Sequence, residues 1–373
     1  MTIAVLGAGM VGLAIALDLA NEYKVTCFDL NAFNLEKVKT RNDTIEIVAA
    51  DLSQFTEYKT WFSPFDLVVT AVPGFMGYKT LEAVINAEKN VVDISFFPED
   101  ALALDELAKE KNITAITDCG VAPGMSNFIL GRYNEEMNVT SFECYVGGLP
   151  KVRKPPFEYK APFSPVDVIQ EYIRPARLVE NGSIVTKPAL SDREIMDFEK
   201  AGKLETFNTD GLRSLIYTMN HIPDMKEKTL RYEGHIDLII ALQQAGFFDT
   251  APIRVNDVDI TPFEFTSKLL VNEWKLEEEE QEFTVMKVIV KGEEKTVEYN
   301  LYDEYDVATK TSSMARTTGY TCTAAVNLIA KNMFTEKGVF PPELIGKDKA
   351  CFDFVINYLK ERNVNWKPLI YSL

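Results

Sequence analysis

The sequence predicts an α/β protein with a doubly wound parallel sheet in its N-terminal third, followed by a central α+β region with a mostly antiparallel mixed sheet. Over the first 120 residues, short β-branched runs alternate with helical patterns, and a glycine-rich turn follows the first run. After residue 125, longer strand-like runs separated by tight-turn signals replace this alternation. The chain has 373 residues, 46% of them apolar, which is enough for two hydrophobic cores.

The N-terminal runs have the length and composition of buried strands, at residues 2–6, 24–28, 45–48, 67–72, 91–94 and 114–117. Helical patterns lie between them, most clearly at residues 11–20, 80–87 and 101–111. Strands and helices that alternate at this spacing imply right-handed crossovers and a parallel sheet. Such sheets bind ligands beyond the carboxyl ends of their strands.

The first strand leads directly into a helical pattern through the residues Gly7, Ala8, Gly9, Met10, Val11 and Gly12. This is the strand–turn–helix context that a dinucleotide-binding GxGxxG motif requires. Gly7 permits the tight turn, Gly9 lets the backbone approach a pyrophosphate, and Gly12 lets the helix pack closely on the strand. We therefore expect Met10 and Val11, at the helix start, to contact the dinucleotide as well. The alternative is a glycine-rich turn that binds no dinucleotide.

Asp29 ends the second predicted strand, about 20 residues after the motif, where its carboxylate can accept hydrogen bonds from the adenosine ribose and would repel a 2′-phosphate. NAD is therefore expected in preference to NADP. Asp51 and Leu52 follow the third strand and are expected beside the adenine. The pyrophosphate and nicotinamide ribose should pass the residues that close the fourth strand, namely Ala71, Val72 and Pro73. Proline at such a position is equally consistent with a simple turn.

The later part of the chain predicts a hairpin at 284–290 and 296–301, strands at 141–146 and 228–232, and helices at 317–332 and 351–362. The last 40 residues are expected to fold back on the N-terminal domain. The proline-rich stretch 151–165 reads as a loop, either covering the site or lying passively on the surface.

Composition excludes several classes of function. A net charge of −17 disfavours binding to nucleic acid or to anionic membranes, and no apolar run approaches the roughly 20 residues of a membrane helix. The five cysteines are widely spaced and form no CxxC pair or Cys/His cluster, so neither a metal site nor a disulfide framework is expected. These features favour a cytoplasmic protein that acts on a small molecule.

Several landmark stretches along the whole chain resemble the saccharopine dehydrogenase superfamily, most closely the lysine 6-dehydrogenase-like proteins of bacteria and archaea: 7–12, 92–99, 120–127, 145–150, 209–214 and 229–235. The resemblance implies a Rossmann domain at 1–122 completed by C-terminal helices at about 325–373. It also implies a catalytic, substrate-binding and dimerisation domain at 123–324, and a homodimer.

The same resemblance implies oxidation at the amine-bearing carbon of an amino acid, with NAD or NADP accepting the hydride. Stretches 93–97 and 210–213 depart from the bacterial lysine dehydrogenase pattern, which leaves the substrate open. The first expectation is oxidative deamination of the lysine side-chain amine. Saccharopine or carboxynorspermidine dehydrogenase chemistry is the alternative, and a non-catalytic NAD-binding protein is a rival of another class.

Amine oxidation requires a general base, because the substrate ammonium must lose a proton before hydride can leave. Asp118, at the end of the sixth strand, and His235, one of two histidines, are the candidates for that base. A turn-capping role for Asp118 and a packing role for His235 are the alternatives. Asp93 could hold the substrate amine or the nicotinamide ribose.

An amino-acid substrate brings a carboxylate, which a guanidinium grips in bidentate geometry. Arg213 and Arg231 are the candidates, with internal salt bridges as the alternative, and Lys160 is a third choice.

Overall fold

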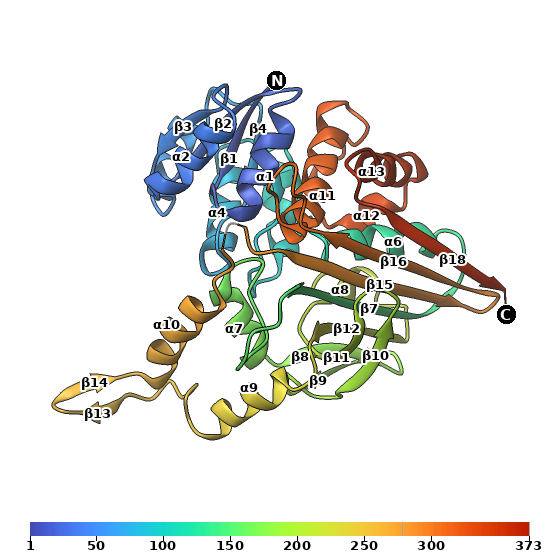
Figure 1. Cartoon of the computed structure of the whole chain (residues 1–373). Coiled ribbons are helices and arrows are strands. Elements are labelled where there is room, and N and C mark those ends of the chain that lie inside the picture. The colour runs from blue at the N-terminus through green and yellow to red at the C-terminus, as the bar shows by residue number, and fades with distance from the viewer. Residues whose placement is uncertain (278, 373) are drawn as a thin grey trace.

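Two large sheets organise the protein, whose computed structural model describes residues 1–277 and 279–372 (Figure 1). Residues 278 and 373, which the predicted domain ranges include, lie outside the described residues.

The N-terminal sheet is parallel throughout, with strand order β17-β6-β5-β4-β1-β2-β3. The order reverses between β1 and β4, which creates the crevice where doubly wound sheets bind ligands. The predicted parallel sheet is confirmed, and its strands are β1 (Thr2–Leu6), β2 (Lys24–Asp29), β3 (Glu46–Ala49), β4 (Leu67–Thr70), β5 (Asn90–Asp93), β6 (Thr114–Ile116) and β17 (Gly338–Phe340).

Crossover helices connect these strands, and they are α1 (Met10–Leu19), α2 (Ala32–Arg41), α3 (Tyr58–Trp61), α4 (Gly74–Asn86) and α5 (Asp105–Glu110). A late helix, α11 (Ser313–Ala330), packs directly on α1. Asp18 of α1 accepts hydrogen bonds from Thr323 of α11 at 2.5 Å and from Tyr358 and Arg362 at 2.7 Å each. The first helix is thereby tied to the C-terminal helices by a charge-assisted network.

The second sheet follows the order β10-β11-β12-β7-β15-β16-β18, with the β8–β9 hairpin attached to β12. β12 runs parallel to β7, and the other neighbouring pairs are antiparallel, which confirms the predicted mixed sheet. The predicted hairpin is β15–β16. The strands are β7 (Val139–Pro150), β8 (Ala176–Glu180), β9 (Ser183–Lys187), β10 (Glu194–Phe198), β11 (Gly202–Asn208), β12 (Asp224–Arg231), β15 (Glu282–Gly292), β16 (Lys295–Glu304) and β18 (Trp366–Ser372).

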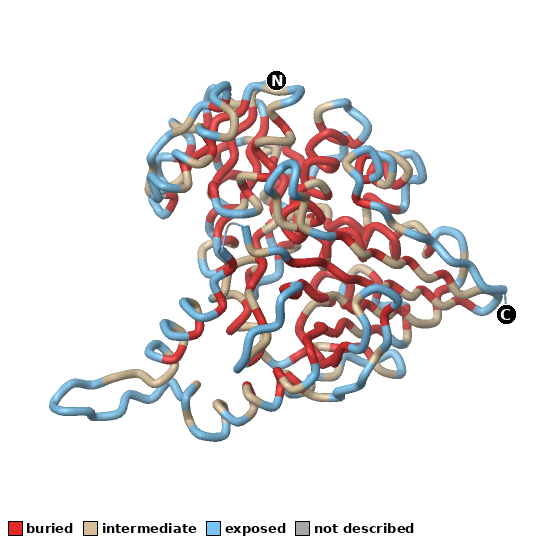
Figure 2. The backbone as a smooth tube through the Cα atoms, viewed as in Figure 1, coloured by how far each residue is buried: buried red, intermediate tan, exposed pale blue. Residues whose placement is uncertain are grey.

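The other helices and one small hairpin are α6 (Met125–Asn134), α7 (Pro165–Ile173), α8 (Leu215–Thr218), α9 (His235–Gln244), α10 (Pro262–Trp274), α12 (Pro342–Gly346), α13 (Lys349–Glu361) and β13 (Ile253–Val255)–β14 (Val258–Ile260). The small hairpin projects from the body beyond α10, and its backbone is largely exposed (Figures 1 and 2).

The C-terminal segment contributes one strand to each of the two large sheets. The domain boundary expected at residue 325 falls inside α11, β17 joins the parallel sheet, and β18 pairs with β16 in the second sheet. One buried apolar cluster also runs from Ile3 and Val69 to Val288 and Val297, so the two sheets share a core. The shared core fixes the position of one sheet relative to the other.

Among the described residues, no helix combines the length and apolarity needed to cross a bilayer. The cysteines are buried and free, namely Cys27, Cys119, Cys144, Cys322 and Cys351.

Candidate active site

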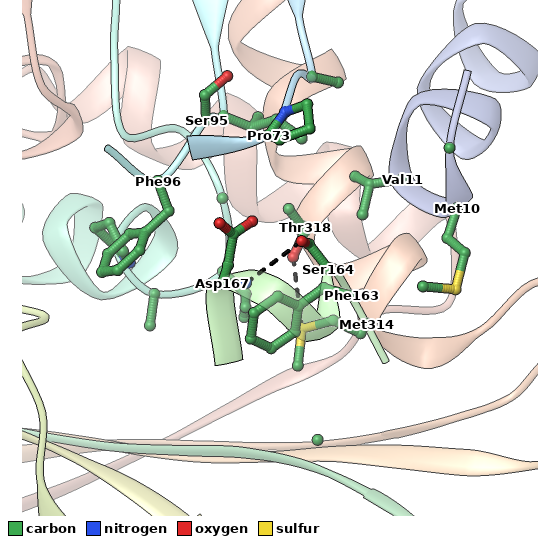
Figure 3. Close-up of a pocket in the computed structure, with 18 of the residues that line it drawn as sticks. Met10, Val11, Pro73, Ser95, Phe96, Phe163, Ser164, Asp167, Met314 and Thr318 are labelled. Carbon is green, nitrogen blue, oxygen red and sulfur yellow. Dashed lines mark hydrogen bonds between the residues drawn. The ribbon is translucent and has the colours of Figure 1, made fainter. Parts of the chain in front are cut away.

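A cavity of ≈ 490 Å³ lies where the carboxyl ends of the parallel strands face the second sheet. In the close-up, Met10 and Val11 of α1 lie on one side, and Asp167 of α7 lies across from them (Figure 3). This volume falls in the range of small-molecule and cofactor sites.

The dinucleotide end is walled by the glycine-rich turn, and Gly7, Gly9, Met10, Val11 and Gly12 all line the cavity. A Cβ on Gly12 would lie 2.0 Å from the carbonyl oxygen of Gly7, whereas a Cβ on Gly9 would meet no atom of the described residues within 4 Å. Gly12 therefore allows the helix to pack on the turn, and Gly9 faces open space next to the N-terminus of α1. The turn fits a pyrophosphate, because backbone N–H groups at a helix start bind anions.

Asp29 lies at the end of β2 and lines the cavity. Its Oδ2 accepts a hydrogen bond from the Ala8 N–H at 2.7 Å, and its Oδ1 accepts one from the Asn31 N–H at 2.7 Å. A carboxylate oxygen can accept two hydrogen bonds, so Oδ1 retains an acceptor position for a ribose hydroxyl.

The other expected cofactor contacts divide into two groups. Ala71, Val72 and Pro73 line the cavity after β4, whereas Asp51 and Leu52 do not line it. Asp51 accepts hydrogen bonds from the backbone N–H and hydroxyl of Ser53, and Leu52 is buried in an apolar cluster. A local turn and a packing contact thus occupy these two side chains.

The substrate end is walled by ionisable side chains. Alternate residues of β12, namely Glu227, Thr229 and Arg231, line the cavity because successive strand residues point to opposite faces of a sheet. Thr209 donates to Glu227 Oε2 at 2.6 Å and lies 2.9 Å from the Thr229 hydroxyl. Burial raises the pKa of Glu227 to about 8, although the Thr209 hydrogen bond opposes this.

Helix α7 contributes Asp167 and Glu171, which are four residues apart and so share one helix face. Burial raises the pKa of Glu171 to about 7, although Arg231 opposes this. Glu171 Oε2 lies 3.6 Å from Nη2 of Arg231.

Arg231 is buried at the end of β12. Its Nε donates to the Tyr172 hydroxyl at 2.8 Å and its Nη1 donates to the Leu230 carbonyl at 2.9 Å. Its Nη2 has no hydrogen-bond partner among the described residues. Arg231 therefore has donors left for an anionic group in the cavity.

Arg213 is engaged differently. Its Nε donates to Asp118 Oδ1 at 2.7 Å, and its Nη1 donates to the Phe97 carbonyl. Asp118 lines the cavity, but Arg213 lies behind it and lines a smaller adjoining pocket. Burial raises the pKa of Asp118, although the charge of Arg213 opposes this. Of the two arginines expected at the substrate, only Arg231 faces the main cavity among the described residues.

Asp93 lies beneath the cavity rather than in its wall. It is fully buried at the end of β5 and accepts a hydrogen bond from the Thr70 hydroxyl at 2.5 Å. Burial raises the pKa of Asp93 to about 7. Ser95, two residues later, is the side chain that reaches the lining.

His235 and Lys160 do not line the cavity. His235 is buried behind Arg231, with Nε2 2.9 Å from the Tyr172 hydroxyl and Nδ1 2.9 Å from the Phe157 carbonyl. Lys160 donates to the Glu273 carbonyl on the outside of the same region.

Several lining residues were not singled out from the sequence: Asp167, Glu171, Thr209, Glu227 and Thr229. A signal existed for some of them. Once residues 228–232 are predicted as a strand that contains Arg231, a two-residue period places Thr229 and Glu227 on the same face. Similarly, Ser164 followed by Pro165 is a helix-start pattern, and a helix there aligns Asp167 with Glu171.

Comparisons with known proteins match both parts of the chain. The family model described as "Saccharopine dehydrogenase NADP binding domain" matches residues 3–116, and "Saccharopine dehydrogenase C-terminal domain" matches residues 120–364. The solved apo saccharopine dehydrogenase (L-Glu forming) from Saccharomyces cerevisiae has a similar fold, with a TM-score of 0.79, 18% identity and 99% of each chain covered.

Curated relatives include alpha-aminoadipic semialdehyde synthase of Arabidopsis thaliana, 26% identical over 57% of this chain and 21% of that protein. Saccharopine dehydrogenase [NADP(+), L-glutamate-forming] of Pyricularia oryzae is 23% identical over 66% of this chain and 58% of that protein. The matched region is thus less than two thirds of the length of either relative. Because the C-terminal domain model alone matches more than half of the chain, the chain belongs to the saccharopine dehydrogenase family.

Proposed function

We propose that this chain is a nicotinamide-dinucleotide-dependent amino-acid dehydrogenase that oxidises the carbon bearing the side-chain amine of lysine. One observation carries the proposal: the dinucleotide-binding turn and a cluster of ionisable side chains line the same cavity. A carbon held between the two ends could lose hydride to a nicotinamide ring while its nitrogen loses a proton to a carboxylate.

The charges of the lining favour a cationic amine with a single carboxylate. At the substrate end the lining includes Asp118, Asp167, Glu171 and Glu227, but Arg231 is the single arginine or lysine of the lining among the described residues. The substrate's ammonium would be held among the carboxylates, and its α-carboxylate would pair with Arg231.

The chain's own residues would perform the proton chemistry. Glu227, whose pKa lies near 8, is the proposed acceptor of the ammonium proton, since a base works best when its pKa is close to the working pH. A nicotinamide bound at the glycine-rich turn would supply the two-electron acceptor for the hydride that leaves the carbon of the free amine. Water adds to the resulting iminium carbon, and ammonia leaves to give the aldehyde.

A saccharopine-type or carboxynorspermidine-type dehydrogenase is the second candidate. It is favoured by the names of the relatives, several of which are saccharopine dehydrogenases. A substrate with several carboxylates needs more than one cationic partner, and Arg213 could serve only if its pair with Asp118 opened.

For the cofactor, two observations favour opposite choices. The family model and the fungal relatives carry NADP in their names. In this chain, however, the carboxylate of Asp29 lines the cavity, and the next five residues, Leu30 to Asn34, offer no lysine or arginine to a 2′-phosphate. We propose NAD as the preferred cofactor on the strength of Asp29.

The test is reduction of NAD and of NADP, followed at 340 nm, with lysine, saccharopine, ornithine and carboxynorspermidine at mildly alkaline pH. Turnover of lysine alone supports the first candidate, and turnover of saccharopine or carboxynorspermidine supports the second. Dinucleotide binding without any turnover would leave a non-catalytic NAD-binding protein as the better description. The homodimer and the cytoplasmic location stay predictions.

A further inference from the structure

We propose that His235 and Tyr172 form a hydrogen-bonded chain that orients Arg231 for the substrate carboxylate, which makes His235 a positioning residue and not the proton acceptor. The inference rests on the proposed function for the identity of the anion, and it assigns to His235 a role different from the one expected from the sequence.

The direction of each hydrogen bond in this chain is fixed by its partners. The Phe157 carbonyl can only accept, so Nδ1 of His235 carries the proton that bridges their 2.9 Å separation. Nε2 of the neutral ring is then an acceptor, and the Tyr172 hydroxyl donates to it across 2.9 Å. The Tyr172 oxygen is left to accept the 2.8 Å hydrogen bond from Nε of Arg231.

The surroundings keep His235 neutral. Burial and the nearby charge of Arg231 lower the pKa of His235 to about 3. Of the neighbouring elements, β12 contributes Arg231, α7 contributes Tyr172, and α10 contributes the uncharged Trp274. The ring of Tyr159, from the loop before α7, packs against His235 at an angle of 55° with the ring centroids 5.0 Å apart. Glu171, also on α7, has its Oε2 3.6 Å from Nη2 of Arg231. A ring so enclosed has no path for accepting a substrate proton in the cavity, which it does not line.

The hydrogen-bonded chain of His235 and Tyr172 holds the guanidinium of Arg231 in one orientation. Tyr172 and the Leu230 carbonyl occupy Nε and Nη1, and the Tyr159 ring lies 4.3 Å from the guanidinium carbon. Arg231 lines the cavity, and its Nη2 has no hydrogen-bond partner among the described residues, with Glu171 Oε2 3.6 Å away. A guanidinium fixed in advance loses less conformational entropy when it binds a carboxylate, so the hydrogen-bonded chain should strengthen substrate binding.

The first experiment tests the hydrogen-bonded chain without any substrate, by measuring where the His235 ring is protonated. The protein has two histidines, so ¹⁵N NMR of ¹⁵N-histidine-labelled protein gives two ring spin systems, and His221→Gln identifies the one from His235. The expected spectrum shows His235 protonated at Nδ1, unprotonated at Nε2 and unchanged between pH 5.5 and 8. Titration of His235 in that range, or a proton on Nε2, would overturn the proposal.

The second experiment measures kinetics with whichever of lysine and saccharopine is turned over. Tyr172→Phe removes the central hydroxyl and keeps the ring, and His235→Leu removes the acceptor. We expect each to raise KM about tenfold with little change in kcat, since hydrogen bonds to charged groups are worth somewhat more than neutral ones. His235→Gln, which retains an acceptor near Nε2, should restore most of the affinity, and the pH profile should keep its shape in all three.

Tyr299→Phe is the matched control, because it also loses a buried tyrosine hydroxyl contact, 3.1 Å from Tyr133 and away from the cavity. It should leave KM unchanged. An unchanged KM in Tyr172→Phe, or loss of a limb of the pH profile in His235→Gln, would overturn the positioning role.

The outcome for Arg231→Ala separates this inference from the proposed function. A wild-type KM in Arg231→Ala means that Arg231 does not bind the substrate, which refutes the carboxylate assignment while the NMR result still tests the hydrogen-bonded chain. If Arg231→Ala raises KM and Tyr172→Phe leaves KM unchanged, the positioning role of His235 and Tyr172 is refuted. The assignment of Arg231 to the substrate carboxylate then still stands.

Discussion

At its dinucleotide end the cavity is walled mainly by backbone and uncharged side chains, with Asp29 as the ionisable residue, whereas at its substrate end it is walled by several ionisable side chains. The first wall comes mainly from two short turns, one holding Gly7, Gly9 and Gly12 and the other following β4. The second wall comes from α7, β12 and the segment after β11. At the dinucleotide end, substitutions that add atoms should therefore have the largest effects on stability and binding. At the substrate end, substitutions that change charge or hydrogen bonding should have the largest effects.

Arg213 and Arg231, the two arginines expected to bind substrate, also differ from each other. Arg213 and Arg231 are both buried, but Arg213 donates a hydrogen bond to the Asp118 carboxylate. Nη2 of Arg231 has no hydrogen-bond partner among the described residues, although Glu171 Oε2 lies 3.6 Å away. The lesson is that burial alone does not identify a ligand-binding arginine. What identifies it is hydrogen-bonding capacity that the protein itself does not use.

The largest effect is expected at Gly12. Its added Cβ in Gly12→Ala would lie 2.0 Å from the Gly7 carbonyl, so helix α1 must move away from the turn. We expect the free energy of unfolding to fall by more than about 4 kcal/mol and dinucleotide binding to be lost. Thermal unfolding and NADH fluorescence titration measure both.

Gly9→Ala is the matched control, because its Cβ would meet no atom within 4 Å in the part of the chain that the structure describes. It should keep the wild-type melting temperature while weakening dinucleotide binding. Equal stability of the two variants would contradict the close contact at Gly12.

The second largest effect is expected at the buried Asp118–Arg213 pair. Arg213→Met leaves the Asp118 carboxylate buried without its partner, and the unfolding free energy should fall by about 3–4 kcal/mol. Denaturant unfolding measures this fall, and Asp118→Asn combined with Arg213→Met should recover part of it. Arg153→Met, which breaks the more exposed pair with Glu158, should cost about 1 kcal/mol or less. Equal losses of unfolding free energy in Arg213→Met and Arg153→Met would show that burial does not make the Asp118–Arg213 pair more important for stability.

A smaller effect is expected at Glu227. Its raised pKa means that it is protonated below about pH 8, so kcat/KM should rise with pH through that value as the base ionises. Glu227→Gln should lower kcat about 100-fold and remove this limb of the profile. An unaltered limb would assign the proton transfer to another group, with Glu171 the next to test.

Glu227 also gives a prediction for stability. The carboxyl ionises at its ordinary pKa when unfolded but only near pH 8 when folded, so the protein loses stability as pH rises from about 4.5 to 8. The melting temperature of Glu227→Gln relative to wild type should therefore increase across this window. A difference that does not depend on pH would mean that the carboxyl ionises alike in both states.

The smallest effect is expected at Asp29. Asp29→Asn keeps an acceptor oxygen for only one of the Ala8 and Asn31 N–H groups and removes the negative charge, so the preference for NAD over NADP should fall by about tenfold. Comparing kcat/KM for the two cofactors measures the change. An unchanged ratio, or a wild-type enzyme that already prefers NADP, would remove Asp29 from cofactor selection.

Local sequence patterns predicted most of the parallel sheet and the glycine-rich end of the cavity. The turn residues Gly7 to Gly12 are adjacent in the chain, and the positions of Ala71 to Pro73 follow from strand order, since the carboxyl ends of parallel strands meet at one edge. Asp51 and Leu52 obey the same rule but do not line the cavity, because a turn around Ser53 and an apolar cluster hold them elsewhere.

The residues alone determined the doubly wound fold, the mixed second sheet and the place of the dinucleotide turn, because those features depend on periodicity and on neighbours in the chain. Only the tertiary structure decided that Arg213 is paired with Asp118, that His235 lies behind Tyr172, and that β12 and α7 bring Glu227 and Glu171 to one cavity. These contacts join residues tens of positions apart, and pKa and hydrogen-bonding capacity follow from burial and partners, which a one-dimensional pattern does not contain.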